Sequence, residues 1–156
     1  MTMTEIKQKL MTIGIGVLAA ASAMGQAKPD LIVRGATVIG DPSGIFVQKV
    51  SVVVENACSE ARAGQSYLLL TFKTGPERDA KSIYYLGNAV KALAGGESQA
   101  QTFDVAAKKI GLGRHILIEA DPYRNVAEAS EENNWRTLFP DGAGVALNYR
   151  QCKTGH

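Results

Sequence analysis

The chain has 156 residues, enough for one domain with a core of its own. Apolar residues make up 46% and charged residues 21%, an ordinary globular composition that argues against a disordered chain. The formal net charge is only +2, the 17 Lys and Arg residues are scattered, and aromatic residues reach only 6%. Because a nucleic-acid-binding protein needs a concentrated basic surface, we expect no nucleic-acid partner.

The amino-terminal residues 1–27 have the three-part pattern of a secretory signal peptide. Two lysines are followed by an apolar run and then by small residues that suit a signal peptidase. We predict a signal peptide over residues 1–25, with cleavage after Gly25, Ala23 or Ala27. An uncleaved membrane anchor is the alternative, although glycines and small residues are poor anchor chemistry. The sequence therefore predicts a secreted or periplasmic protein that makes no membrane contact after cleavage.

The remainder of the chain consists of short segments in which apolar and polar residues alternate, the period of a half-buried β-strand. Turn-forming residues separate these segments, and no helical period is sustained. One segment is ambiguous, because Ile83–Tyr85 favour a strand whereas residues 88–93 are compatible with a helical turn. The predicted strands span residues 30–39, 46–56, 65–74, 83–93, 98–106, 115–121, 135–139 and 145–151. We therefore predict an all-β fold, an antiparallel β-sandwich of seven to eight strands over residues 28–152, with a flexible tail at 153–156.

The stretch from Gly113 to Asn134 carries the most specific pattern in the chain. Its first part alternates with a period of two, so one row should face the core and the other should face outward. The inward row is Ile116, Ile118 and Ala120, and the outward row is Leu117, Glu119 and Asp121. Pro122 has no N–H to donate and restricts the residue before it, so it ends the strand. The acidic segment that follows is predicted to be the turn of a long hairpin.

Carboxylate and amide side chains gather in this turn, and they have two interpretations. Calcium prefers such oxygen ligands, and the candidate ligands are Asp121, Asn125, Glu128 and Glu131. A twelve-residue calcium loop, however, needs glycine where this chain has Val126. The alternative, which we favour, is that these residues hydrogen-bond nearby backbone and order the hairpin. The residues assigned to that ordering role are Asp121, Pro122, Asn125, Glu128, Glu131, Asn133 and Asn134.

Cys58 and Cys152 are the only cysteines. An even number of cysteines in an exported protein favours a disulfide, and counting strands places both residues at the same end of the sandwich. The bond would enclose most of the domain and stabilise it by about 4–5 kcal/mol on the loop-entropy model. A bond to a partner chain and two free thiols are the alternatives.

The sequence offers little chemistry for catalysis. His115 and His156 are the only histidines, too few for a zinc site of ordinary composition. No nucleophile elbow, zinc-protease helix motif or phosphate-binding loop is present. Asp104 and Glu119 are interpreted as solvated strand carboxylates rather than a catalytic pair. We therefore expect no enzymatic activity and, calcium aside, no cofactor.

Several aromatic residues could either fill the core or mark a contact surface. They are Tyr84, Tyr85, Tyr123, Trp135 and Tyr149. Trp and Tyr dominate the energetics of binding surfaces, but they also fill sandwich cores, and we favour the core assignment.

Four motifs together resemble the CARDB family, the cell adhesion related domain found in bacteria. They are Asp30-Leu31-Ile32-Val33, then Val50-x-Val52-x-Val54-x-Asn56, then Leu93-x-x-Gly96-Glu97-Ser98, and finally Ile116-x-Ile118-x-Ala120-Asp121-Pro122 followed by Asn125-Val126-x-Glu128-x-x-Glu131-x-Asn133-Asn134. The resemblance covers residues 30–140. The chain departs from the family in its extension from Gly142 to His156 and in having Cys58 where a small residue is usual.

The resemblance implies an immunoglobulin-like β-sandwich that acts by binding rather than by catalysis. The partner would be a protein or a glycan at the cell envelope. Two alternatives stay open, namely a structural subunit of an envelope or extracellular assembly, and a small exported regulator of a hydrolase. An edge strand with unpaired backbone groups is a further route to a partner or to self-association.

Overall fold

The computed structural model of the protein describes residues 26–138, which form seven β-strands and one short 3₁₀ helix. The strands are β1 (Leu31–Gly40), β2 (Val47–Asn56), β3 (Ser66–Lys73), β4 (Ser82–Val90), β5 (Ser98–Asp104), β6 (His115–Ala120) and β7 (Trp135–Leu138), and the helix is η1 (Ala106–Lys108). Residues 26–138 contain no α-helix, and no helix among them is long and apolar enough to cross a membrane. The predicted signal peptide, the predicted strand at 145–151 and the predicted tail lie outside the described residues.

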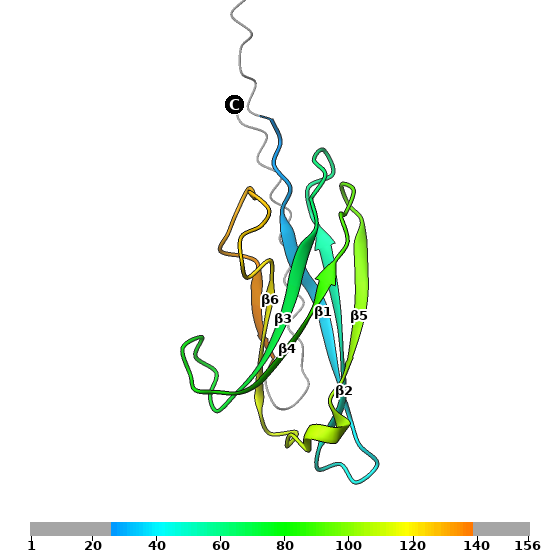
Figure 1. Cartoon of the computed structure of the whole chain (residues 1–156), viewed down its shortest axis with the longest axis vertical. Helices are drawn as coiled ribbons and strands as arrows, with labels where there is room; N and C mark the ends of the chain where they lie inside the picture. The colour runs from blue at the N-terminus through cyan, green and yellow to red at the C-terminus, as the bar shows by residue number, and fades with distance from the viewer. Residues whose placement is uncertain (1–25, 139–156) are drawn as a thin grey trace, which may run out of the picture.

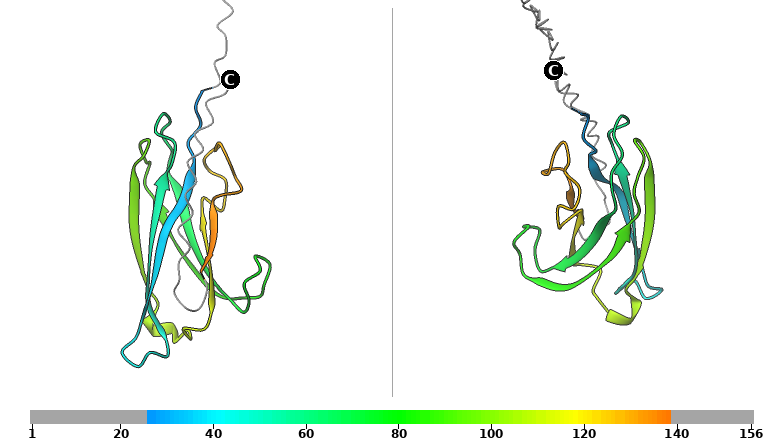
Figure 2. Two further views of the ribbon diagram at one scale, coloured as in Figure 1. Left: turned by 180° about the vertical axis from the view of Figure 1, so that it is seen from behind. Right: turned by 45° about the horizontal axis from the view of Figure 1, so that its top comes forward.

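The strands form two antiparallel sheets that pack against each other as two layers (Figure 1). The smaller sheet has the order β1-β2-β5, and the larger sheet has the order β4-β3-β6-β7. The view from behind shows β1 and β2 of the smaller sheet in front of the larger one (Figure 2). The predicted immunoglobulin-like antiparallel sandwich is therefore confirmed, with seven strands in the described part of the chain.

The core lies between the two sheets, where one row of side chains from each strand meets. Val50, Val52 and Val54 of β2 form this row in the smaller sheet, and each is fully buried. In the larger sheet Phe72 of β3 lies opposite Ile116 of β6 on the same inner face. Burying one such side chain contributes about 1.5–3 kcal/mol, so these rows hold the two layers together.

The inward row predicted for β6 is confirmed, because all three of its side chains belong to the core. The outward row is wrong at Leu117 and Asp121, which are both buried. Leu117 is only 4% exposed because it lies between Thr71 of β3 and Thr137 of β7, in the interior of the larger sheet. Asp121 is buried because the hairpin turn folds over it.

Two predicted boundaries also differ from the structure. Residues 88–93 form no helical turn, because β4 continues to Val90 and Leu93 then exchanges backbone hydrogen bonds with Ala63 at 2.9 and 3.1 Å. The strand predicted to reach residue 106 ends at Asp104. The Asp104 carboxylate accepts the N–H of Ala106 at 3.1 Å, which turns the chain into η1.

Close packing of two connections at one end of the sandwich depends on Gly95. A Cβ atom on Gly95 would lie 2.1 Å from the carbonyl oxygen of Ser59, in the turn after β2. Because the obstacle is backbone, we expect Gly95→Ala to lower the free energy of unfolding by about 1–3 kcal/mol. Chemical denaturation measures this change. Gly111→Ala is the control, because no atom lies within 4 Å of its added Cβ, and equal losses in both variants would contradict the packing described here.

Candidate functional site

The hairpin turn between β6 and β7 folds back onto the start of β1 instead of standing in solvent. Its centre is Glu128, which is 6% exposed. One Glu128 carboxylate oxygen accepts the N–H of Leu31, and the other accepts Nδ2 of Asn134 at 2.8 Å. The N–H of Ala129 also donates to the carbonyl of Pro29 at 2.9 Å. These bonds connect the last hairpin of the described chain to its first strand.

Asp30 completes this connection from the other side. It is fully buried, and both of its carboxylate oxygens accept Nδ2 of Asn133, at 2.9 and 3.1 Å. Its own N–H donates to Oδ1 of Asn56 at 3.1 Å, and its carbonyl accepts the N–H of Ala57 at 2.7 Å. From the sequence, Asp30 and Asn56 had no predicted role beyond the family motif. The available signal was that each is a polar residue at the end of an apolar strand, where backbone N–H and C=O groups need hydrogen-bond partners. We name the whole set the acidic clasp: Asp30, Asp121, Glu128, Asn133 and Asn134.

Asp121 opens the turn. Its backbone has φ = +49°, and β6 ends one residue earlier, at Ala120. The Asp121 carboxylate accepts the N–H groups of Asn125 at 3.0 Å and Val126 at 2.8 Å. Its own N–H donates to the carbonyl of Tyr67 in β3 at 2.8 Å. A short polar side chain that satisfies nearby backbone in this way stabilises a tight turn.

Burial of these carboxylates changes their ionisation. Burial raises the pKa of Glu128 to about 8, the hydrogen bond from Leu31 lowers it, and the charges of Glu131, Asp121 and Asp30 raise it further. Burial also raises the pKa of Asp30, against the opposing hydrogen bond from its asparagine partner. Desolvation disfavours a charged carboxylate, so the clasp favours a bound proton.

The four residues considered as calcium ligands make other contacts in the structure. Asp121 and Glu128 accept backbone N–H groups, and Asn125 contributes its N–H rather than its side-chain oxygen. Glu131 accepts the N–H of Glu128 at 3.4 Å and lies 3.9 Å from Nε of Arg124. Between residues 26 and 138 no group of three or more His, Cys, Asp or Glu side chains is arranged to hold a metal ion. Calcium binding stays the alternative to the favoured ordering role, and calorimetric melting with calcium and with chelator tests it.

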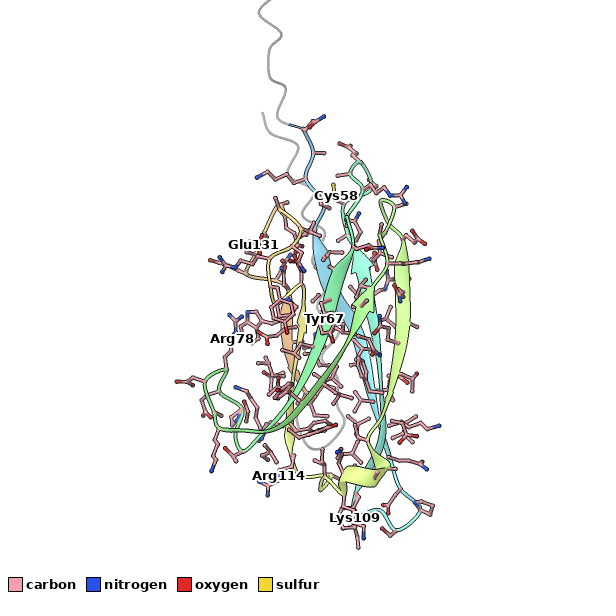
Figure 3. The ribbon with its side chains drawn as sticks, viewed as in Figure 1. Cys58, Tyr67, Arg78, Lys109, Arg114 and Glu131 are labelled. Atoms are coloured by element: carbon pink, nitrogen blue, oxygen red, sulfur yellow. The ribbon has the colours of Figure 1, made fainter. Side chains whose placement is uncertain are left out.

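Aromatic and arginine side chains gather on the outer face of the larger sheet, beside the clasp. The rings of Tyr67 and Tyr123 lie 5.7 Å apart at 47°. The guanidinium of Arg78 lies 5.2 Å above the ring of Trp135, and its Nη2 is 3.0 Å from Oε1 of Glu119. Glu119 is therefore paired rather than solvated. Figure 3 shows Arg78 and Glu131 on the same side of the molecule, next to β6. We name this set the outer aromatic face: Tyr67, Arg78, Tyr123, Arg124 and Trp135.

The favoured core assignment is wrong for three of the aromatic residues, because Trp135 lies on the outer aromatic face and two tyrosines are exposed. Tyr123 is 64% exposed and Tyr85 is 70% exposed. Tyr84 does pack against the core, with its ring 6.4 Å from that of Phe72. Neighbouring residues in a strand point to opposite faces, so the sequence could not decide which tyrosine of the Tyr84-Tyr85 pair turns inward. Tyr149 lies outside the described residues.

A shallow polar hollow of about 30 Å³ separates the outer aromatic face from the clasp. It lies between Arg78, Trp135, Arg124 and the two ends of the turn. This volume has room for only about two water molecules. The hollow is suited to receive a side chain or hydroxyl of a larger partner, because a small-molecule pocket is roughly ten times larger.

The raised pKa of Glu128 predicts that stability falls as pH rises. The unfolded chain ionises this carboxyl near 4.5 and the folded chain near 8, so the folded state binds its proton more tightly between these values. From about pH 5 to about pH 8 the free energy of unfolding should therefore fall by at least about 1 kcal/mol. Glu128→Gln should flatten this slope, leaving the smaller contribution of Asp30, as urea unfolding at each pH would measure.

The matched control is Glu132→Gln, which removes an exposed carboxyl from the same turn and should keep the wild-type slope. Parallel stability curves for the wild type and Glu128→Gln would contradict the ionisation described for the clasp.

Cys58 lies at the end of the sandwich where the chain enters β1 (Figure 3). It is fully buried and is not a free thiol. Its predicted partner Cys152 lies outside the described residues, so the pairing stays a prediction. Alkylation of the denatured, unreduced protein should label neither cysteine, and reduction should expose both. Labelling of both without reductant would refute the bond.

The family model CARDB matches residues 28–138. A cell-surface protein domain of Methanosarcina acetivorans is similar, with 19% identity, a TM-score of 0.53, and coverage of 71% of this chain and 89% of that chain. A CARDB domain from Pyrococcus furiosus, solved in complex with di-metal ions, has 20% identity, a TM-score of 0.49, and coverage of 71% and 85%. A β-glucosidase of Streptomyces venezuelae has 22% identity and a TM-score of 0.36, and the similarity covers 71% of this chain but 15% of that enzyme. No curated protein matches the sequence.

The family match extends over most of the sequence and ends at Leu138, where the described residues also end. The four motifs that carry the resemblance all lie within it, and all five clasp residues belong to them: Asp30 to the first motif, and Asp121, Glu128, Asn133 and Asn134 to the last. The Methanosarcina acetivorans domain shares the sandwich fold. The chain belongs to the CARDB family, a family of cell-adhesion-related domains.

Proposed function

We propose that this protein is an exported, non-enzymatic adhesion-type module that contacts a protein or a glycan at the cell envelope. Family membership supports the adhesion-type role. The observation that carries the proposal is the outer aromatic face, which combines two tyrosines in ring contact with a tryptophan and two arginines that line a hollow. The predicted signal peptide supports the envelope location, because it would take the chain to the compartment where adhesion partners lie.

The chemistry of the outer aromatic face suits recognition of a large partner. Trp, Tyr and Arg are the residues that most often dominate binding energy. Aromatic rings can stack on the C–H faces of sugars or on apolar side chains, while Arg78 and Arg124 can donate several hydrogen bonds. Arg124 is well exposed and its ion pair with Glu131 is long, at 3.9 Å, so its guanidinium is available to a partner.

The backbone beneath this face is ordered before any partner arrives. Tyr67 extends from β3 in the middle of the larger sheet, and its ring covers Gly87, where an added Cβ would lie 2.4 Å from Cε1. Tyr123 and Arg124 belong to the turn that the acidic clasp closes. Binding groups that are already ordered lose less conformational entropy on association. The buried carboxylates therefore support a binding surface, rather than supplying acid or base to a substrate.

We expect Tyr123→Ala to weaken partner binding by at least about ten-fold, the usual loss at the centre of a binding surface. The measurement is biolayer interferometry of the purified full chain against peptidoglycan, a glycan array and immobilised envelope proteins. Binding to carbohydrate or to protein identifies the class of partner.

Ile39→Ala is the control, because it shortens an exposed side chain of β1 in the opposite sheet. It should bind as the wild type does. Equal affinities for the wild type and Tyr123→Ala would contradict the proposed face, and turnover of any carbohydrate by the purified chain would contradict the non-enzymatic role.

A further inference from the structure

Among residues 26–138, the larger sheet has an open edge at β4. Within that range only β3 pairs with this strand, and residues Ser82–Val90 contain neither a charged residue nor a proline. Natural edge strands usually carry such residues, because unpaired N–H and C=O groups otherwise pair with another chain. Figure 2 shows the β3–β4 hairpin leaning away from the smaller sheet at its tip.

The direction of the free backbone groups follows from two hydrogen bonds. The carbonyl of Tyr67 in β3 points toward the β6 side, where it accepts the N–H of Asp121. Ala89 of β4, which lies opposite Tyr67, therefore makes no backbone hydrogen bond to β3. The carbonyl of Ala89 instead accepts Nε2 of Gln101 from β5 at 2.8 Å. Because the direction alternates along a strand, Tyr85 and Gly87 also point their N–H and C=O groups away from β3.

The open part of this edge has two ends. At Ala89 the glutamine of β5 covers the backbone. At Ile83 the register of the β3–β4 ladder shifts, because Phe72 pairs with Tyr84 and the next residue of β3 pairs with Ser82. Such a bulge interrupts regular pairing and turns the edge aside. Between these ends no other hydrogen bond among the described residues reaches the backbone of Tyr85 or Gly87.

We propose that this edge pairs with the same edge of a second copy of the chain, antiparallel, about a two-fold axis at Leu86. Tyr85 of each copy then lies opposite Gly87 of the other, and each of these two pairs exchanges two backbone hydrogen bonds. The two larger sheets become one continuous sheet. Such an interface is isologous, so it closes at two copies.

The shape of the edge favours a second copy over another strand. Its two ends, at Ile83 and Ala89, are equally distant from Leu86. When two copies pair about an axis at Leu86, the open part of one edge therefore matches the open part of the other over its whole length. The edge is uncharged, and a copy of itself brings no charge that would lack a partner. The exposed ring of Tyr85 would lie opposite Gly87 of the other copy, beside the Tyr67 ring that already covers that glycine, and contact between two aromatic rings would add to the stability of the pair.

The proposed pairing does not depend on the proposed function, but it would assist it. Two copies would present two outer aromatic faces on one continuous sheet. Partners that repeat along a surface, such as glycan chains, are held more tightly by two linked sites than by one.

The register is tested by oxidative cross-linking of the full chain. In the proposed dimer Leu86 faces Leu86 of the other copy as a non-hydrogen-bonded pair, in which the Cα atoms approach to about 4.5 Å, within reach of a disulfide. Leu86→Cys should therefore yield a covalent dimer on mild oxidation, seen on a non-reducing gel. Asn88→Cys is the control, because it lies opposite a different residue and should yield far less. Native Cys58 is not a free thiol and does not interfere.

Sedimentation velocity over a range of concentrations tests the association itself. The wild type should shift from monomer to dimer, and Tyr85→Pro should weaken the dimer by at least about ten-fold, because it removes an outward N–H without breaking the β3 ladder. The control is Ile39→Ala in β1, which should dimerise as the wild type does. Alanine is used there because proline would disturb the pairing of β1 with β2. A wild type that stays monomeric, or a Leu86→Cys variant that cross-links no more than Asn88→Cys, would overturn the proposal.

Discussion

The hydrogen bond between Glu128 and the first residue of β1 is the contact on which the arrangement of this domain depends. It joins the hairpin turn after β6 to the strand that begins the smaller sheet. Asp30 and Asn133 make a second connection across the same boundary. Without these bonds the long turn would have no fixed position, because its residues contribute only Val126 to the hydrophobic core.

The buried carboxylates of the acidic clasp hold the hairpin turn in place. A buried charge is unfavourable unless it is paired or protonated, and the clasp combines several hydrogen bonds with a raised pKa at Glu128. These hydrogen bonds hold the turn in one conformation, which fixes the positions of Tyr123 and Arg124 relative to Trp135. The domain thus orders a surface of aromatic and cationic groups by means of buried polar groups.

Much of the fold could be predicted from the sequence, because the alternation of residues in segments such as Val50–Val54 predicts both the strand and the face that it buries. The hairpin turn and its polar residues were also found, since Asp121-Pro122 ends a strand on local chemistry alone. The burial of Leu117 could not be predicted, because it depends on the neighbouring strands of the larger sheet rather than on the alternation within β6. The roles of Asp30 and Asn56 were missed for the same reason, as their partners lie far away in the sequence.

The most direct test of this account is the ionisation of Glu128, followed by NMR through the chemical shift of its carboxyl carbon during a pH titration of the folded protein. A midpoint near pH 8 is expected. The same titration should show the amide proton of Leu31 responding at that pH, because it donates to this carboxylate. A midpoint near the ordinary value of 4.5 would mean that water reaches the carboxylate, and that the clasp does not hold the turn in the way described.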